Sequence, residues 1–516
     1  MPTRLQLDGK SLTLDLLAPI ARGAEVSIEL SPATLEGVAR ARAVVERHIA
    51  SGDVVYGLTT GFGKLKNVAI AREDLVELQR NLVLSHCCGI GDPMPIQEVR
   101  LSQVLRLNGL VRGHSGVRVE LVEFLARLIE KGFVPVVPQQ GSVGASGDLA
   151  PLAHMAATLL GHGEAYLWRP GEAARMPAAE ALAEIGETPI DLQAKEGLAL
   201  VNGIEVMKAT GVSTWLQASN LSRAADAIAS LTIEALLGSV QPFDDRFADL
   251  KGHKGHRRTS DNVRACMLDS EVLAFHADCD RVQDPYSLRC IPQIHGAFKA
   301  CLAHVGRIFG DEVNSVTDNP ILFPDTDEVI SAGQFHGQPV SIPLDYLAIA
   351  LCTLANVSER RIEQLVNPDL SRLPAFLSPN PGLNSGMMIA QVAAASLASE
   401  NKSLAHPASV DSIPTSANQE DHVSMGVTAA RNARTICDNV ENVLAIEYLC
   451  AAQAHEFHVD LRAGKGAQAA YELIRTRVAP LESDRVLRPD IEAARELIAS
   501  GALVAAVEEA VGPLFD

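Results

Sequence analysis

One short stretch of the chain sets a serine among residues with almost no side chains. It reads GSVGASGDLAPLAH over residues 141–154, with Ser146 between Ala145 and Gly147. Small residues allow the backbone to compress, so the amide nitrogen of Gly147 can attack the carbonyl carbon of Ala145 and close a five-membered ring. Loss of water from Ser146 then leaves an exposed methylidene, an electrophile that no standard side chain supplies. We therefore interpret Ser146 as the precursor of an electrophile.

The same stretch has alternative interpretations. A glycine- and serine-rich loop before a helix is ordinary turn chemistry. A serine hydrolase is a weaker hypothesis because Asp148 occupies the last glycine of the G-x-S-x-G elbow, and a catalytically inactive helical scaffold is another. Asp148 is expected to cap a helix that begins near Leu149 and ends before Gly161, with the positive helix end directed at Ser146.

Other familiar signatures are incomplete. GFGK at residues 61–64 lacks the first glycine and the final Ser or Thr of a phosphate-binding loop. HEFH at residues 455–458 is one residue too short for the zinc-protease motif. The histidines of KGHKGH, His253 and His256, are expected on a solvated loop. The sequence therefore predicts no metal site.

Charge and cysteine content restrict the partners and the compartment. The formal net charge is −19 and the pI is near 5.3, which disfavours nucleic acid and anionic membranes as partners. The nine cysteines are scattered, without a C-x-x-C pair, which is typical of a reduced compartment. The first residues lack a signal-peptide pattern. We expect a cytoplasmic protein that binds a small molecule.

The elements that must position the serine loop are mostly helices. Aromatic residues make up only 4% of the chain, too few for a typical sandwich or barrel core. Asp8-Gly9, flanked by alternating apolar residues, predicts a small N-terminal β-hairpin, and Ser31-Pro32 predicts the start of a helix that runs to about Ile49. Long apolar helices are expected at residues 342–366, 384–406 and 430–454, which favours a bundle of associated chains.

Beyond these patterns, the whole chain resembles a known family, the aromatic amino acid ammonia-lyases. The resemblance rests on motifs that occur in one order: VYGLTTGFG (55–63), LVLSHCCGIG (82–91), GSVGASGDLAPLAHM (141–155), EGLALVNG (196–203), VQDPYSLRC (282–290), SVTDNP (315–320), GQFHGQP (333–339) and SVDSIPTSANQEDHVSMG (409–426). It implies a mainly α fold, a long-helix bundle like that of the fumarase/aspartase superfamily. It also implies that Ala145-Ser146-Gly147 cyclises unaided into 4-methylideneimidazol-5-one (MIO), with no external cofactor.

The resemblance also implies roles for other residues. Tyr56 is the base that removes the β-proton of the substrate, and Arg289 clamps the substrate carboxylate, for which its planar fork is suited. The remaining residues that the family places at the site are Gln283 and Tyr286 near the arginine, Asn202 toward the carboxylate and the MIO oxygen, and Phe335 against the ring. In the family each site is assembled from three chains of a homotetramer.

Glu420 and His86 indicate the substrate. An imidazole offers an N–H donor and an ionisable nitrogen, which a carboxylate and a histidine can bind, whereas a phenyl ring satisfies neither group. We therefore predict non-oxidative deamination of L-histidine to trans-urocanate and ammonia, the first step of histidine degradation. The alternative is a phenylalanine or tyrosine ammonia-lyase, or an aminomutase, of the same family.

Several positions depart from the pattern of the histidine branch. They are Ile204-Glu205, Gln334, Gln338, Ile291 and His295. The chain is expected to form one continuous lyase unit with three approximate parts: residues 1–200 with the MIO loop, 201–430 with the long helices, and a helical 431–516.

Overall fold

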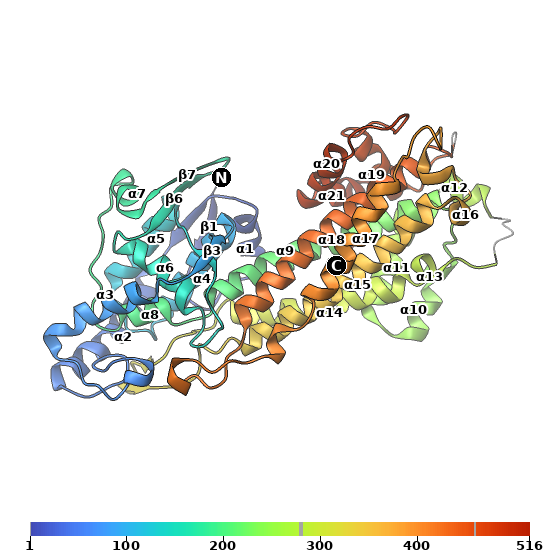
Figure 1. Ribbon diagram of the computed structural model, residues 1–516. Coiled ribbons are helices and arrows are strands. Elements are labelled where there is room, and N and C mark those ends of the chain that lie inside the picture. Colours follow the sequence, from blue (N-terminus) through green and yellow to red (C-terminus); the bar gives the residue numbers. More distant parts are fainter. Residues whose placement is uncertain (1, 278–281, 459–460) are drawn as a thin grey trace. The chain divides into compact units, whose positions relative to one another are not determined.

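Helices dominate the computed structural model, which describes residues 2–277, 282–458 and 461–516 (Figure 1). The chain forms two compact units. The first comprises Met1–Ser213, Gly306–Leu344 and Pro407–Arg431, and the second comprises Thr214–Val305, Asp345–His406 and Asn432–Asp516. The expected mainly α fold is confirmed.

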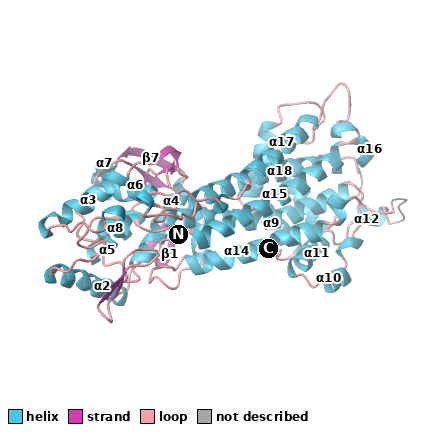
Figure 2. Ribbon diagram, turned by 60° about the horizontal axis from the view of Figure 1, so that its bottom comes forward, coloured by secondary structure: helices cyan, strands magenta, loops and turns pink. Residues whose placement is uncertain are grey.

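The first unit mixes helices with short strands. Its helices are α1 (Leu14–Ala21), α2 (Pro32–Ser51), α3 (Leu75–His86), α4 (Ile96–Leu110), α5 (Val119–Glu130), α6 (Leu149–Leu159), α7 (Ala178–Glu184) and α8 (Glu196–Val201). Its strands are β1 (Thr3–Gln6), β2 (Val26–Glu29), β3 (Ile90–Pro93), β4 (Phe133–Pro135), β5 (Pro138–Gln140), β6 (Glu164–Arg169), β7 (Glu172–Pro177), β8 (Ile321–Phe323) and β9 (Glu328–Ile330). The sheets are small, β1-β2, β3-β5, β4-β6-β7 and β8-β9, and every strand among the described residues belongs to this unit (Figure 2).

The described residues of the second unit form helices and the loops that connect them, with no strand. Its own helices are α10 (Asp245–Lys251), α11 (Lys254–Cys266), α12 (Glu271–Phe275), α13 (Tyr286–Arg289), α16 (Pro368–Ser371), α17 (Met388–Leu404), α19 (Lys465–Arg475), α20 (Arg488–Ala499) and α21 (Ala502–Val511). The boundary between the units falls within four longer helices, α9 (Glu205–Ala235), α14 (Ile291–Glu312), α15 (Gln338–Val366) and α18 (Gly426–His455).

The N-terminal hairpin prediction is wrong. β1 pairs in parallel with β2, and α1 connects the two strands. Asp8 explains the difference, because its Oδ1 accepts hydrogen bonds from the backbone N–H groups of Lys10 and Ser11. This local turn leads the chain toward Thr13, whose side chain caps α1. The Asp-Gly pair therefore starts a helix connection and not a returning strand.

The predicted helices are present with shifted ends. α2 begins at Pro32 after the Ser31 cap, whose side chain accepts from Thr34 N, and it ends at Gly52 in the left-handed conformation. α15 begins four residues earlier than expected, at Gln338, and α17 begins later than expected, at Met388. α15 is long and apolar enough to cross a membrane, but 61% of its apolar window is buried in the protein, as in a core helix.

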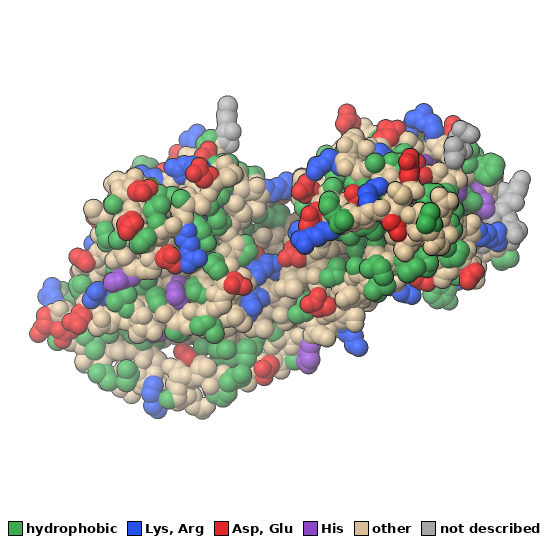
Figure 3. Space-filling model, turned by 45° about the horizontal axis from the view of Figure 1, so that its top comes forward, with side chains coloured by type: hydrophobic (Ala, Val, Ile, Leu, Met, Phe, Trp, Pro, Cys, Tyr) green, Lys and Arg blue, Asp and Glu red, His purple; other side chains and the backbone are tan. Residues whose placement is uncertain are grey.

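Two apolar clusters hold the segments that carry the predicted site residues. Leu58, fully buried just after Tyr56, packs with Val44 and Val45 of α2 and with Leu322 of β8. A second cluster fixes α6 directly behind the serine loop. It consists of Met94, Val99, Val134, Val137, Leu152, Met155, Trp168 and Val206. Acidic and basic side chains are interspersed on the face shown in Figure 3.

Candidate active site

The serine loop is pressed against a neighbouring backbone in the first unit. Gly147 has a φ of +77°, and a Cβ at this position would overlap the carbonyl oxygen of Gly203. Asp148 N donates a hydrogen bond of 2.6 Å to that same oxygen. Only glycine combines this left-handed conformation with so close an approach. Gly147, whose nitrogen would close the ring, is therefore held by the backbone of Gly203.

Asp148 does not cap α6, contrary to expectation. The helix begins at Leu149 as predicted, but the aspartate side chain makes no capping bond to it. Its Oδ2 instead accepts 2.9 Å hydrogen bonds from Val206 N and Met207 N, in the first turn of α9. Asp148 therefore joins the serine loop to a helix that begins 57 residues later in the chain, at Glu205.

Burial makes Asp148 a much weaker acid than an exposed aspartate, so that part of it is still protonated near neutral pH. The residue is fully buried, and its Oδ1 has no hydrogen-bond partner among the described residues. Burial raises the pKa of the carboxyl to about 7, and the nearby charge of Glu205 adds to this increase, against the two backbone hydrogen bonds that lower it.

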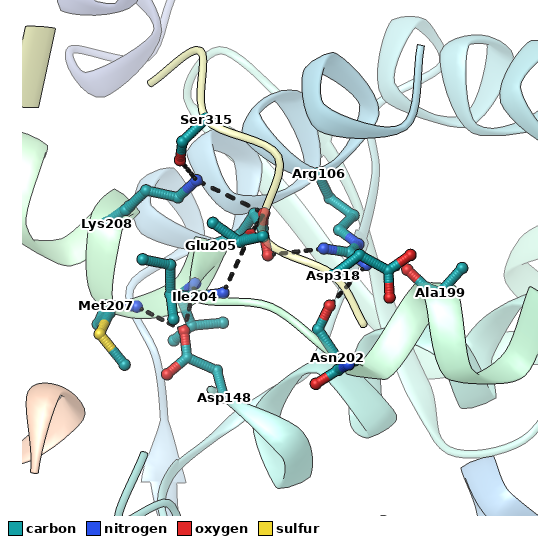
Figure 4. A network of polar contacts seen from close by, with 12 residues as sticks. Arg106, Asp148, Ala199, Asn202, Ile204, Glu205, Met207, Lys208, Ser315 and Asp318 are labelled. Atoms are coloured by element: carbon teal, nitrogen blue, oxygen red, sulfur yellow. Dashed lines mark hydrogen bonds and ion pairs between the residues drawn. The ribbon is translucent and has the colours of Figure 1, made fainter. Parts of the chain in front are cut away.

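Glu205 anchors the other side of Gly203, in the network drawn in Figure 4. It is fully buried, and it accepts hydrogen bonds from Arg106 Nη1 at 2.9 Å and from Thr317 Oγ1 at 2.6 Å. Lys208 Nζ lies 3.5 Å from Glu205 Oε1, the oxygen that Thr317 also binds. Burial raises the pKa of Glu205, but the charges of Arg106 and Lys208 outweigh that effect, so the pKa is lowered overall. Glu205, which departs from the family pattern, thus forms a buried ion pair with Arg106 and Lys208 beneath Gly203.

Glu420 lies directly over the precursor serine. Ser146 Oγ donates a hydrogen bond of 3.2 Å to Glu420 Oε1, and Thr415 Oγ1 donates one of 2.7 Å to Glu420 Oε2. Backbone hydrogen bonds between Thr415 and Glu420 close the loop on itself. The carboxylate is thereby fixed beside Ser146, while its residue remains partly exposed. Thr415 carries no signal in the sequence, because a threonine in a loop is ordinary.

Tyr56 and His86 lie within the electrostatic influence of this carboxylate. Burial raises the pKa of the Tyr56 phenol, and the negative charge of Glu420 raises it further. The N–H of Gly63, which donates to the phenol oxygen at 3.4 Å, lowers the pKa and so opposes this rise. Burial lowers the pKa of His86, while Glu420 acts in the opposite direction. Tyr56, His86, Ser146 and Glu420 are thus brought together in the first unit. In this state the phenol is protonated and the imidazole is neutral at pH 7.

Asn202 and Phe335 also belong to the first unit. Asn202 is 3% exposed; its Nδ2 donates to Asn319 O at 3.0 Å, whereas its buried Oδ1 has no partner among the described residues. Phe335 is half-buried in the loop before α15. The next residue, His336, lies parallel to His422 with ring centroids 5.8 Å apart. This stacking joins the Phe335 loop to the Glu420 loop.

The remaining predicted residues lie in the second unit. Arg289 Nε donates to Asp284 O at 2.9 Å, and the guanidinium carbon lies 4.5 Å from the ring centroid of Tyr286, which is 69% exposed. Gln283 and Arg289 line a cleft of about 700 Å³ within this unit. Arg289, the predicted carboxylate clamp, is thus a lining residue of a cleft.

Two other predictions from sequence are resolved in this unit. His256 lies within α11 and is 2% exposed, so its expected place on a solvated loop is wrong; Gly255 and Gly296 allow α11 and α14 to approach closely there. His295, a departure from the family pattern, is buried with its Nδ1 2.7 Å from Asp226 Oδ1. Its role within the unit is therefore structural.

Comparisons with known proteins identify the family. The family model for aromatic amino acid lyases matches residues 12–476. The chain belongs to the aromatic amino acid lyase family.

Members of that family resemble the chain over nearly its whole length. A histidine ammonia-lyase of Symbiobacterium thermophilum is 53% identical over 507 residues, which are 98% of this chain and 99% of that protein. The crystal structure of histidine ammonia-lyase from Trypanosoma cruzi superposes with a TM-score of 0.91 at 41% identity, covering 98% of this chain and 96% of that one. A tyrosine aminomutase from Streptomyces globisporus also has a TM-score of 0.91, at 35% identity, covering 99% of each chain. The fold is therefore common to lyases and aminomutases, and the substrate must be argued from the site.

Proposed function

We propose that this aromatic amino acid lyase removes ammonia from L-histidine without oxidation and releases trans-urocanate. The observation that carries the proposal is the carboxylate of Glu420, held 3.2 Å from Ser146 Oγ with His86 nearby in the same electrostatic environment. A carboxylate accepts the N–H of an imidazole, whereas a phenyl ring offers no donor to Oε1, the oxygen that Thr415 does not bind, at a cost of about 1–3 kcal/mol.

The residues at the loop fit the MIO group that the family uses. Ala145, Ser146 and Gly147 supply all the ring atoms, and the space beside Gly147 admits no side chain. Asn202, next to Gly203, has a buried Oδ1 with no hydrogen-bond partner in the described part of the chain. When formed, the group supplies an electrophile that takes the substrate's amino group and makes it a better leaving group. No external cofactor is then needed.

The chain's own side chains divide the remaining work. Glu420 and His86 bind and orient the imidazole, and Tyr56 removes the β-proton. Arg289 holds the carboxylate through two parallel hydrogen bonds, with Gln283 and Tyr286 beside it. Asn202 assists at the carboxylate, and Phe335 packs against the ring.

We further propose that the active form is a cytoplasmic homotetramer with sites shared between chains. Arg289, Gln283 and Tyr286 belong to the second unit, whereas Tyr56, Ser146 and Glu420 belong to the first. We infer that different copies contribute these two sets, so that the site is complete only in the assembly. A cation from another copy would also lower the raised pKa of Tyr56, as a base requires.

Product identification tests the assignment. The purified protein is supplied in parallel with L-histidine, L-phenylalanine and L-tyrosine, and urocanate, cinnamate, coumarate and β-amino acids are separated by chromatography. We expect urocanate to form fastest, and an intact mass two waters below the sequence mass. Ser146→Ala should lose both the near-ultraviolet band and turnover. Faster release of cinnamate, coumarate or a β-amino acid would refute histidine as the substrate.

Glu420→Gln separates substrate choice from formation of the electrophile. The variant keeps the shape of the side chain but loses the charge that accepts the imidazole N–H. We expect histidine turnover to fall by roughly 30-fold, the equivalent of about 2 kcal/mol, while the mass deficit and the near-ultraviolet band remain. Unchanged histidine turnover would exclude Glu420 as the substrate-binding carboxylate.

A further inference from the structure

Ser424 lies where three loops of the first unit meet, and none of the family roles above uses it. Its side chain is fully buried. It follows the Glu420 loop and directly precedes Met425 and α18. Its neighbours in space come from the serine loop and from the start of α15, which are distant in sequence.

The first contact of Ser424 is with the serine loop. Gly144 has a φ of +74°, and a Cβ on this glycine would overlap Ser424 Oγ. The hydroxyl therefore fills the space beside Gly144 Cα. The next residue, Met425, donates its backbone N–H to Val143 O at 2.9 Å. Side chain and backbone together fix the residues that immediately precede Ala145.

The hydroxyl of Ser424 is itself held in place. Gly426 N donates to Ser424 Oγ at 3.3 Å, and Ser341 Oγ donates to Ser424 O at 2.7 Å. A Cβ on Gly337 would lie 2.8 Å from Ser424 Oγ, so that glycine leaves the room that the hydroxyl occupies. The Gly426 hydrogen bond and the room left by Gly337 thus hold the hydroxyl against Gly144, whereas Ser341 contacts only the backbone carbonyl of Ser424.

The opposite end of the precursor triplet is fixed as well. Gly147 is pressed against the carbonyl of Gly203, as described above. Ala145-Ser146-Gly147 therefore lies between two supports, Ser424 on the Gly144 side and Gly203 on the Gly147 side. Movement of either support outward would let the triplet extend and separate the two atoms that must bond.

We propose that Ser424 is a positioning residue for ring closure, acting through Gly144 on the carbonyl of Ala145. This inference rests on the proposed function. In the closure, Gly147 N bonds to the carbonyl carbon of Ala145, and its hydrogen passes to the carbonyl oxygen. That oxygen leaves as water with the amide hydrogen of Ser146, and the Ser146 hydroxyl then leaves as a second water with the Cα hydrogen. The steps need no oxidant, so correct placement of the two atoms is the main requirement.

Ser424→Ala tests the proposal, with Ser341→Ala as the matched control. Both substitutions remove one fully buried hydroxyl from the same cluster, but only the first removes the atom against Gly144. Each chain is made by cell-free synthesis, and intact mass and near-ultraviolet absorbance are followed with time. We expect loss of the two waters to be roughly tenfold to a hundredfold slower in Ser424→Ala, and close to the wild-type rate in Ser341→Ala, with similar melting temperatures.

The outcomes separate this inference from the proposed function. If the wild-type chain never loses two waters, the proposed function fails. If the wild type cyclises and Ser424→Ala matches it, or if both variants are slowed equally, the positioning role of Ser424 is overturned. Should Ser424→Ala fail to fold, Ser424→Cys replaces it, because its sulfur keeps an atom against Gly144. Closure at the wild-type rate in that variant supports the contact, and slower closure than in Ser341→Ala overturns it.

Discussion

The carboxylate of Glu420 lies close enough to Tyr56 to have two opposing effects on the proposed catalysis. It binds the imidazole in the proposed function, but its negative charge also disfavours the phenolate of Tyr56 and so adds to the pKa increase that burial causes. The proposed base works only when deprotonated. The residue that selects the substrate therefore makes the base harder to ionise.

This opposition predicts a pH effect. Glu420→Gln removes the negative charge, so the pKa of Tyr56 should fall and the phenolate should form at lower pH. A spectrophotometric titration of tyrosinate absorbance measures it, with each chain compared with the same chain carrying Tyr56→Phe, so that the difference reports Tyr56 alone. An unchanged or higher midpoint in Glu420→Gln would show that the two groups do not interact.

At the residue scale, the candidate site residues could be named from the sequence, but the residues that hold them in place could not. Ser146 stands out because glycine and alanine surround it, and Tyr56, His86 and Glu420 lie in long motifs. Thr415 and Ser424 carry no such signal, since serine and threonine are common in loops. Only the fold reveals that one holds the carboxylate and the other lies against Gly144.

Among the elements, the start of α9 depends on a side chain from the serine loop. Asp148 accepts two backbone N–H groups there, and its pKa is raised from 3.8 to about 7. Between these values the folded chain holds a proton that the unfolded chain has lost. The contribution of this group to stability is therefore fully present below about pH 4 and is lost as the pH rises toward 7.

Asp148→Asn tests this dependence. The amide oxygen still accepts the two N–H groups but does not titrate, so the free energy of unfolding should fall less between pH 4 and 7 than with Asp148 present. Urea unfolding across that range measures it, in a Ser146→Ala background that keeps both chains uncyclised. Identical pH profiles for the two chains would contradict the raised pKa.

The buried ion pair beneath Gly203 predicts a larger loss of stability. Glu205→Ala leaves the buried charges of Arg106 and Lys208 without their partner, which should lower the free energy of unfolding by about 3–5 kcal/mol. Glu29→Ala is the control, because its ion pair with Arg4 is exposed and should contribute little. Thermal melting compares the two variants, and equal shifts would show that Glu205 is not an anchor.

Sequence patterns identified helices better than their connections. Ser31-Pro32 gives α2 its start because a cap and a first-turn proline act locally. The hairpin predicted from Asp8-Gly9 and the α6 cap predicted from Asp148 are wrong because their partners are distant in sequence. The strand β1 pairs with β2, which lies beyond α1, and Asp148 binds the start of α9. Local rules identify a turn or a capping residue, but tertiary contacts decide which element it serves.

For the molecule as a whole, sharing of sites between copies is testable by mixing inactive chains. Tyr56→Phe and Arg289→Ala should each abolish most turnover. When the two are co-expressed, random assembly places an intact Tyr56 and an intact Arg289 together in roughly a quarter of the sites if different chains supply them. Turnover of the mixed assemblies should therefore exceed that of either variant alone. Activity no higher than that of the single variants would mean that each chain supplies both residues.

The division of the chain into three parts, residues 1–200, 201–430 and 431–516, stays a prediction.

The proposed ring is made from the backbone of Ala145-Ser146-Gly147, which lies between Ser424 and Gly203, and this origin bears on the lifetime of the catalyst. A reactive group made from the backbone cannot be lost by dilution, and shortage of a vitamin or a metal cannot limit it. It also cannot be exchanged: once a stray nucleophile has added irreversibly to it, no fresh cofactor can diffuse in. Recovery of that site then requires synthesis of a new chain, so cells would restore activity by translation and not by repair.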